Sequence, residues 1–183
     1  EETDLPWDYR RIILNYLKPD MKLLDVDTGG GEFLLSLHHP HENTSAAEAY
    51  PPNVALCKET LLPLGIDFRA GDGKDALPFE DASFDMVINR HGDFNAADMH
   101  RILKDSGIFI TEQVGAENDR ELVELLLGKT ALPFPEQYLE IARRKFCDAG
   151  FDILDAQECF RPIKFYDVGA LVWFAHIIAW EFP

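Results

Sequence analysis

The chain has 183 residues, of which 46% are hydrophobic, and its formal net charge is -16 at pH 7. This length and composition predict one ordered domain over residues 1–183, open to truncation at either end because the sequence starts without Met. The negative charge repels phosphate backbones and anionic lipid surfaces, so we expect neither nucleic acid nor a membrane as partner. Three well-separated cysteines favour reduced thiols in a cytoplasmic protein over a disulfide framework.

The first half of the chain alternates short apolar runs with apolar residues at helical spacing. In chain order these patterns predict a helix at 7–17, a strand at 22–26, a helix at 31–37, a strand at 44–49, a helix at 51–64 and a strand at 67–70. Pro6 suits the first turn of the first helix, and Gly65 suits the end of the third.

The second half continues this alternation. It predicts a strand at 84–89, a helix at 96–103, a strand at 107–113, helices at 119–127 and 136–149, a strand at 151–159 and a helix at 168–179. Such alternation favours a doubly wound α/β fold, a mainly parallel sheet with helices on both faces. The last helix is almost wholly apolar, so we expect it to be buried, with Asp167 as its N-cap.

A glycine-rich turn joins the first predicted strand to the following helix. The strand contains Asp25, and the turn holds three consecutive glycines at 29–31. Glycine tolerates positive φ and lets a ligand approach the backbone, and the first βα turn of such folds binds nucleotides. The dinucleotide pattern G-x-G-x-x-G fits poorly, because Leu34 stands where its third glycine is required.

This turn resembles motif I of the class I S-adenosylmethionine-dependent methyltransferases, in which an acid precedes alternating glycines. Asp25 corresponds to the acid, and Gly29 and Gly31 correspond to the second and third glycines. Asp27 stands in place of the first glycine. The resemblance puts its carboxylate where the donor's methionine part is expected, so that it either meets the donor's ammonium group or obstructs binding.

The resemblance continues in the family's own order over residues 22–113. Glu48 corresponds to the acid that accepts hydrogen bonds from the ribose hydroxyls, and Asp72 to the acid that contacts the adenine amino group. Residues 84–89 and 101–107 are similar to the fourth-strand motif and to the stretch before the fifth strand. The match implies S-adenosylmethionine as cofactor and, as cofactor-binding residues, Asp25, Asp27, Gly29, Gly31, Glu48, Asp72 and Asn89.

The resemblance implies transfer of a methyl group to a small-molecule acceptor. This chemistry mainly requires donor and acceptor to be held in line, and it needs a base only when the acceptor loses a proton. His91, just after the fourth predicted strand, is the candidate base because histidine titrates near neutrality. The alternative is a polar loop residue that only orders the site. We expect no metal site, because His38, His39 and His41 lack a supporting pattern of cysteines or carboxylates.

Two other functions stay open on the sequence alone. A non-catalytic S-adenosylmethionine-binding or regulatory protein on the same fold is favoured by Asp27, whereas a nicotinamide-dependent oxidoreductase is disfavoured by the glycine spacing. The acceptor and the oligomeric state are left open. The family's sheet usually has a seventh strand, antiparallel between the fifth and sixth. Because residues 168–179 predict a helix, we expect that strand to be absent from this chain.

Overall fold

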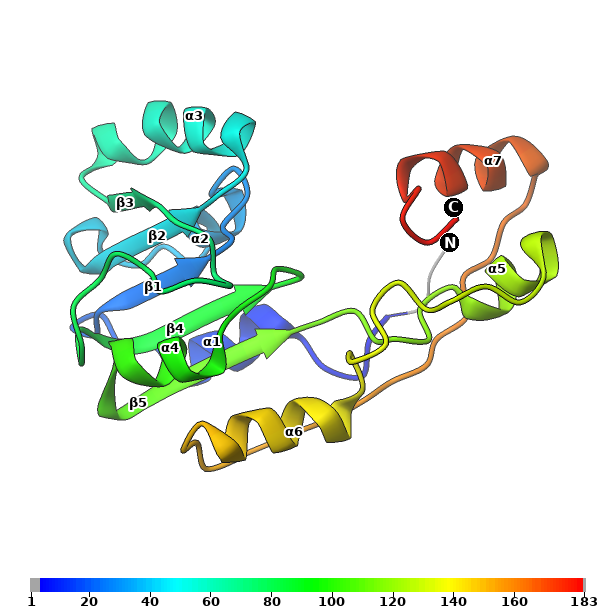
Figure 1. The fold of residues 1–183 in the computed structure, drawn as a ribbon. Helices are drawn as coiled ribbons and strands as arrows, with labels where there is room; N and C mark the ends of the chain where they lie inside the picture. The colour runs from blue at the N-terminus through cyan, green and yellow to red at the C-terminus, as the bar shows by residue number, and fades with distance from the viewer. Residues whose placement is uncertain (1–3, 183) are drawn as a thin grey trace. The chain divides into compact units, whose positions relative to one another are not determined.

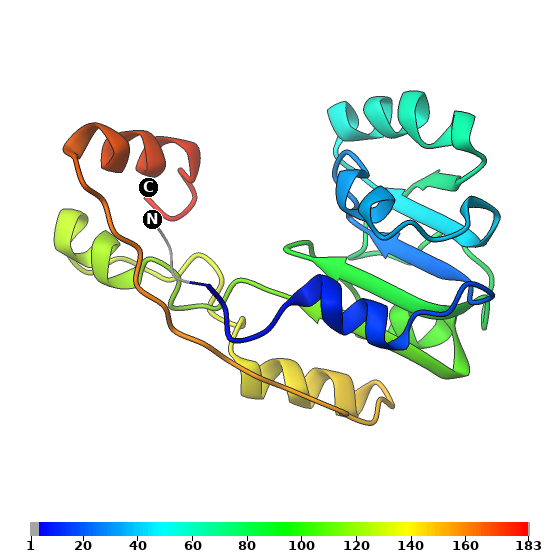
Figure 2. The same ribbon diagram turned by 180° about the vertical axis from the view of Figure 1, so that it is seen from behind.

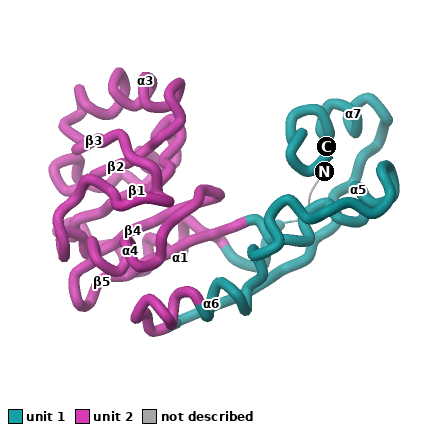
Figure 3. Tube along the Cα trace, in the orientation of Figure 1, with its two compact units in different colours: residues 1–7, 114–144, 153–183 teal, residues 8–113, 145–152 magenta. Residues whose placement is uncertain are grey.

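The structure is a computed structural model that describes residues 4–182. These residues form two compact units, coloured separately in Figure 3. The magenta unit, labelled unit 2 in Figure 3, comprises residues 8–113 and 145–152, and we call it the sheet unit. The teal unit, labelled unit 1 there, comprises the other described residues, and we call it the second unit. The expectation of one domain over residues 1–183 stays a prediction.

The sheet unit is built on five parallel strands in the order β3-β2-β1-β4-β5 (Figure 1). The strands are β1 (Leu23–Val26), β2 (Thr44–Glu48), β3 (Asp67–Ala70), β4 (Phe84–Arg90) and β5 (Leu103–Glu112). The order reverses beside β1, so a crevice for ligands is expected at the carboxyl ends of β1 and β4. The parallel α/β sheet is confirmed, although β5 begins earlier than the predicted 107.

Helices cover both faces of this sheet, as predicted (Figures 1 and 2). They are α1 (Tyr9–Tyr16), α2 (Glu32–Ser36), α3 (Pro51–Thr60), α4 (Ala96–Ile102) and the end of α6 (Leu139–Asp148). Leu23 packs in a core with α1, α2 and α3, whereas its neighbour Leu24 packs in a second core with α4. All four residues of β1 are buried, which is typical of a central strand in a parallel sheet covered on both sides.

Two helix boundaries differ from the prediction. Asp8 is the N-cap of α1 and accepts a hydrogen bond from the Arg11 N–H at 3.0 Å, so Pro6 precedes the helix and does not lie in its first turn. The predicted helix at 51–64 breaks into α3 and a 3₁₀ turn, η2 (Leu62–Leu64). Gly65 ends η2 in the left-handed conformation, with φ of 84°. A further 3₁₀ turn, η1 (His41–Asn43), precedes β2.

The second unit contains α5 (Arg120–Leu127), the start of α6 and α7 (Val168–Ile177). The predicted strand at 151–159 is wrong, because these residues form no strand. A strand needs a neighbour for its backbone hydrogen bonds, and no strand element follows β5 in the part of the chain that the structure describes. Phe151 packs against the second core, but Leu154 is 73% exposed and none of residues 152–159 is buried.

The helix prediction for α7 is confirmed, but its expected burial is wrong. The Asp167 carboxylate accepts a hydrogen bond from the Ala170 N–H at 2.7 Å and so caps the helix. Val172 and Trp173 are 61% and 65% exposed. The ring contacts of α7 run through Phe174, which leaves its other sides uncovered. Within residues 4–182, no helix has both the length and the apolar character that crossing a bilayer requires.

A buried carboxylate fastens α4 to the segment between β3 and β4. The Asp98 carboxylate accepts hydrogen bonds from the Leu77 N–H at 2.8 Å and from the Arg101 guanidinium at 2.6 Å. Arg101 also donates to the carbonyls of Leu77 and Phe79 and to the exposed carboxylate of Asp81. Asp98 therefore satisfies a buried backbone donor and pairs with a charge that also bonds to this segment.

We expect Asp98→Ala to lower the free energy of unfolding by about 2–3 kcal/mol, because it leaves a buried N–H unsatisfied and removes the buried partner of a half-buried ion pair. Urea denaturation measures the change. Asp81→Ala is the matched control, since the Asp81 side chain is 77% exposed and its loss should cost at most about 0.5 kcal/mol. Equal losses in the two variants would contradict the prediction.

Candidate functional site

The glycine turn after β1 consists largely of left-handed backbone. Asp27, Gly29 and Gly31 have φ of 57°, 63° and 86°, as expected for a turn that requires glycine. A Cβ added to Gly31 would lie 2.8 Å from a methyl of Leu61, so close packing also requires that glycine. A Cβ added to Gly29 would meet no atom within 4 Å. The space beside Gly29 is therefore open to a ligand.

The Glu48 carboxylate, at the end of β2, fixes this turn. One oxygen accepts hydrogen bonds from the Gly29 N–H at 2.8 Å and the Asn53 amide at 3.3 Å, and the other accepts from the Ala49 and Tyr50 N–H groups, both at 2.9 Å. These four bonds use the whole acceptor capacity of the carboxylate. Glu48 is only 5% exposed, so it holds the turn against β2 from inside the fold.

A thiol from α3 holds the other end of the same peptide segment. The Cys57 thiol donates to the Gly29 carbonyl at 3.1 Å, while the Gly29 N–H donates to Glu48. Burial raises the pKa of Cys57 to about 11, with further increases from the charges of Glu48, Glu32 and Asp25. The thiol therefore stays protonated at neutral pH and keeps its role as a donor.

Asp25 is buried within β1 and bonded to the turn. Its carboxylate accepts a hydrogen bond from the Thr28 hydroxyl at 2.7 Å, and the Thr28 N–H donates to the Ala47 carbonyl at 3.2 Å. Burial raises the pKa of Asp25 to about 7; the Thr28 bond lowers it, and the charges of Asp27 and Glu48 raise it. Asp25 thus lies behind the turn, as an internal support for its backbone.

Asp27 lies against the backbone after β4. Val26 pairs with Asn89 in the sheet, so the residues that follow each strand are neighbours. A Cβ added to Gly92 would lie 2.7 Å from the Asp27 carboxyl carbon, with a carboxylate oxygen still closer. Burial raises the pKa of Asp27 to about 6; the charges of Glu48, Asp72 and Asp93 raise it further, and that of Lys74 lowers it. Gly92 therefore provides the room that the Asp27 side chain occupies.

The loop after β3 completes this edge of the sheet. The exposed carboxylate of Asp72 accepts a hydrogen bond from the Lys74 N–H at 2.9 Å. The Gly73 carbonyl accepts from the Asn95 N–H at 2.7 Å, and the Lys74 ammonium lies 2.7 Å from the Asp93 carboxylate. The loops after β1, β3 and β4 thus meet at one edge, which brings Asp27 and Asp72 into one electrostatic environment.

Asn89 lies inside the sheet. Its side-chain N–H donates to the Val26 carbonyl at 3.0 Å, and its side-chain oxygen accepts from Gln113 at 2.6 Å and from Thr111 at 3.3 Å. The Tyr9 hydroxyl donates to its backbone carbonyl at 3.0 Å. Asn89 is fully buried, so its side chain braces β1 against β5. A direct contact of Asn89 with a cofactor stays a prediction, and this burial does not support it.

His91 follows β4 in the left-handed conformation, with φ of 59°. Its imidazole is 49% exposed and lies 3.9 Å from the Glu112 carboxylate, which is also 3.3 Å from the Arg90 guanidinium. The His91 N–H donates to the Glu112 carbonyl at 3.0 Å. Left-handed backbone in a residue other than glycine is uncommon and gathers at functional sites. Among the site residues, Asp27 and His91 share this feature at adjacent strand ends.

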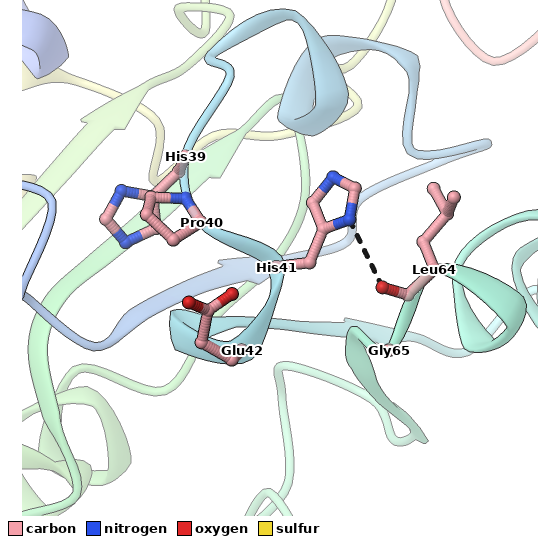
Figure 4. Close-up of a pocket in the computed structure, with 6 residues that line it drawn as sticks. All are labelled: His39, Pro40, His41, Glu42, Leu64 and Gly65. Carbon is pink, nitrogen blue, oxygen red and sulfur yellow. Dashed lines mark hydrogen bonds between the residues drawn. The ribbon is translucent and has the colours of Figure 1, made fainter.

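A shallow pocket lies at the amino ends of β2 and β3, where η1 and η2 lead into these strands (Figure 4). It is lined by His39, Pro40, His41, Glu42, Leu64 and Gly65. His41 donates to the Leu64 carbonyl at 3.1 Å, and His39 donates to the Met21 carbonyl at 2.8 Å. Within residues 4–182, no three histidines, cysteines or carboxylates lie together so as to hold a metal ion.

Several residues that shape the site were missed from the sequence. Asn53 bonds to Glu48, Lys74 pairs with Asp93, and Gly92 admits Asp27. Of these residues, only Gly92 could have been found from the sequence, since a glycine just past a predicted strand often marks a close approach to the backbone. The sequence does not indicate that Asp27 is the residue that approaches it.

Residues 24–111 match a family model described as a methyltransferase domain. A demethylmenaquinone methyltransferase from Thermus thermophilus is 32% identical over 104 residues, which cover 55% of this chain and 47% of that protein. Through this segment, the chain resembles the class I S-adenosylmethionine-dependent methyltransferases. The matched segment includes the glycine turn, Glu48, Asp72 and His91.

Two further proteins resemble this chain. A phthiotriol/phenolphthiotriol dimycocerosates methyltransferase from Mycobacterium tuberculosis is 31% identical over 111 residues, covering 57% of this chain and 40% of that protein. A putative methyltransferase from Bacillus halodurans has a TM-score of 0.61 at 18% identity and covers 81% of this chain and 70% of that chain. This likeness in structure shows the fold, and the chain spans less than half of the length of either sequence relative.

We expect Gly92→Ala to lower the free energy of unfolding by about 1–3 kcal/mol, because the new methyl group overlaps the Asp27 side chain. The Asp27→Gly/Gly92→Ala double variant should recover most of this loss, and thermal or urea unfolding of all four proteins gives the coupling energy. Gly115→Ala is the control, since its nearest neighbour would be a carbonyl 3.8 Å away. Additive losses would show that Asp27 and Gly92 are independent.

The pH dependence of stability tests the burial of Asp25. Because burial raises the folded-state pKa to about 7, above the unfolded value of about 4, the folded protein binds this proton more tightly. The stabilisation of the folded state by this bound proton is full below about pH 4 and is lost as the pH rises through about 7. Asp25→Asn keeps an acceptor for Thr28 but removes this titration. Relative to wild type, it should therefore gain about 1–3 kcal/mol between about pH 5 and about pH 8. Parallel profiles of unfolding free energy would contradict this.

Proposed function

We propose that this methyltransferase domain transfers the methyl group of S-adenosylmethionine to a small-molecule acceptor. The observation that carries the proposal is the turn after β1, where Gly29 is open to a ligand and Glu48 fixes its peptide from β2. This arrangement lies inside the segment that matches the methyltransferase family model. The names of the two sequence relatives, which refer to demethylmenaquinone and to phthiotriol compounds, support a small-molecule acceptor.

The charges around the turn fit this donor better than a nicotinamide dinucleotide. The residues that gather there are acidic: Asp25, Asp27, Glu48 and Asp72. A sulfonium cation is stabilised by such a field, whereas the pyrophosphate of a dinucleotide is repelled by it. We therefore favour S-adenosylmethionine over the nicotinamide alternative.

Each residue of the turn has a distinct role in this proposal. When bound, the donor supplies an electrophilic methyl group on sulfur. Gly29 and Gly31 keep the backbone open, and Glu48 would accept hydrogen bonds from the ribose hydroxyls in place of its longest bond, the 3.3 Å contact with Asn53. Asp72 is exposed and would contact the adenine amino group, as in the family pattern. These contacts orient the donor and take no part in bond breaking.

His91 is the proposed base when the acceptor must lose a proton. Its imidazole is half exposed, so an acceptor has access to it, and the nearby Glu112 carboxylate stabilises the imidazolium that forms. The Arg90 guanidinium lies 3.3 Å from the same carboxylate and holds it in place. We further propose that residues 1–183 act as one domain in the cytoplasm, which three unpaired cysteines support.

Calorimetric titration with S-adenosylmethionine and with NAD tests the proposal. We expect binding of the first and none of the second. Transfer of labelled methyl from the bound donor to a metabolite mixture then separates an enzyme from a binding protein. Binding of NAD alone would overturn the proposal, and donor binding without turnover on any acceptor would favour the non-catalytic alternative.

We expect Glu48→Ala to weaken binding of S-adenosylmethionine by about tenfold or more, since the ribose loses a charge-assisted acceptor and the Gly29 N–H loses its partner. Calorimetry measures the affinity, and circular dichroism verifies that the variant is folded. Glu42→Ala is the matched control, because Glu42 lines the pocket at the amino ends of β2 and β3. An unchanged affinity in Glu48→Ala would remove Glu48 from the site.

A further inference from the structure

Methyl transfer changes the charge of the molecule that occupies the donor site. The methyl–sulfur bond breaks, the electron pair stays on sulfur, and the positive charge leaves with the methyl group to the acceptor. S-adenosylmethionine carries a sulfonium, an ammonium and a carboxylate, whereas S-adenosylhomocysteine carries only the last two. A negative charge near the sulfur therefore distinguishes donor from product, although the two molecules differ by one methyl group.

We infer that Asp27, held against Gly92, makes the site prefer the cationic donor to the neutral product. This inference rests on the proposed function and deepens it. The family pattern has glycine at this position, so the carboxylate is a property of this chain. In this inference Asp27 is a selectivity residue and Gly92 a positioning residue.

Asp27 differs from its acidic neighbours in having no partner. Asp25 bonds to Thr28, Glu48 accepts four hydrogen bonds, and Asp72 and Asp93 each contact Lys74. Among the described residues, no hydrogen bond or ion pair involves the Asp27 carboxylate. A partly buried carboxylate without a partner is costly, and a cationic ligand would relieve that cost.

The geometry keeps this carboxylate in place. Asp27 has φ of 57°, which sets the direction of its Cα–Cβ bond, and the missing side chain of Gly92 leaves the volume that the carboxylate fills. The charged groups around it are Asp25, Glu48, Asp72, Asp93 and Lys74. Lys74 lies 2.7 Å from Asp93, so its charge is largely matched there. The net field at Asp27 is negative, which favours the donor and is lost as the carboxylates take up protons.

The test is the ratio of the dissociation constants of S-adenosylhomocysteine and S-adenosylmethionine, measured by calorimetry on the whole chain. Because both ligands report on the same folded protein, loss of folded material cancels in this ratio. We expect wild type to prefer the donor at about pH 8 and to lose part of this preference at about pH 5, as Asp27 becomes protonated. Asp27→Asn should lower the ratio about three- to tenfold at about pH 8 and flatten its pH dependence.

The control is Asp105→Asn, which removes an exposed carboxylate near the start of β5, at the other edge of the sheet. It should leave the ratio unchanged. If Asp27→Asn does not fold, Asp27→Gly serves in its place, because glycine suits the positive φ. An unchanged ratio in the Asp27 variant overturns this inference and leaves the proposed function standing. Binding of neither ligand by wild type overturns both.

Discussion

The hydrogen bond from the Gly29 N–H to the Glu48 carboxylate is the interaction on which the site depends. It joins the end of β2 to the turn after β1. The pairing of β1 with β2 in the sheet ends at Val26 and Ala47, so it does not hold the turn itself. With Cys57 bound to the Gly29 carbonyl, the peptide is held from two directions. A turn with so much left-handed backbone would otherwise sample many conformations, and a ligand would have to order it on binding.

The carboxylates at the carboxyl ends of the strands repel one another, and this repulsion destabilises the folded state. Asp25 and Asp27 both have raised pKa values, about 7 and about 6, because burial and neighbouring carboxylates disfavour their charges. Perturbed titration of this kind is typical of functional sites. The edge marked by the family motif is therefore also an edge where the charged forms of two carboxylates, Asp25 and Asp27, are disfavoured.

The sequence predicted the sheet well, because buried parallel strands such as β1 are short apolar runs with few other conformations available. It also predicted the glycine turn, whose φ values follow from residue type. It failed where the outcome depended on distant partners. Residues 151–159 have strand-like composition but no neighbouring strand, and α7 is apolar but not covered. The contact of Asp27 with Gly92 joins residues 65 positions apart, which no local pattern encodes.

The two left-handed residues, Asp27 and His91, have an implication for how this protein would respond to laboratory evolution. Each holds a backbone conformation that glycine adopts at lower cost, by roughly 1 kcal/mol. A library screened only for heat tolerance would be drawn toward glycine at these two positions, and would lose a carboxylate and an imidazole from adjacent strand ends. At these two neighbouring positions, a substitution that raises thermostability would therefore remove a side chain of the candidate site.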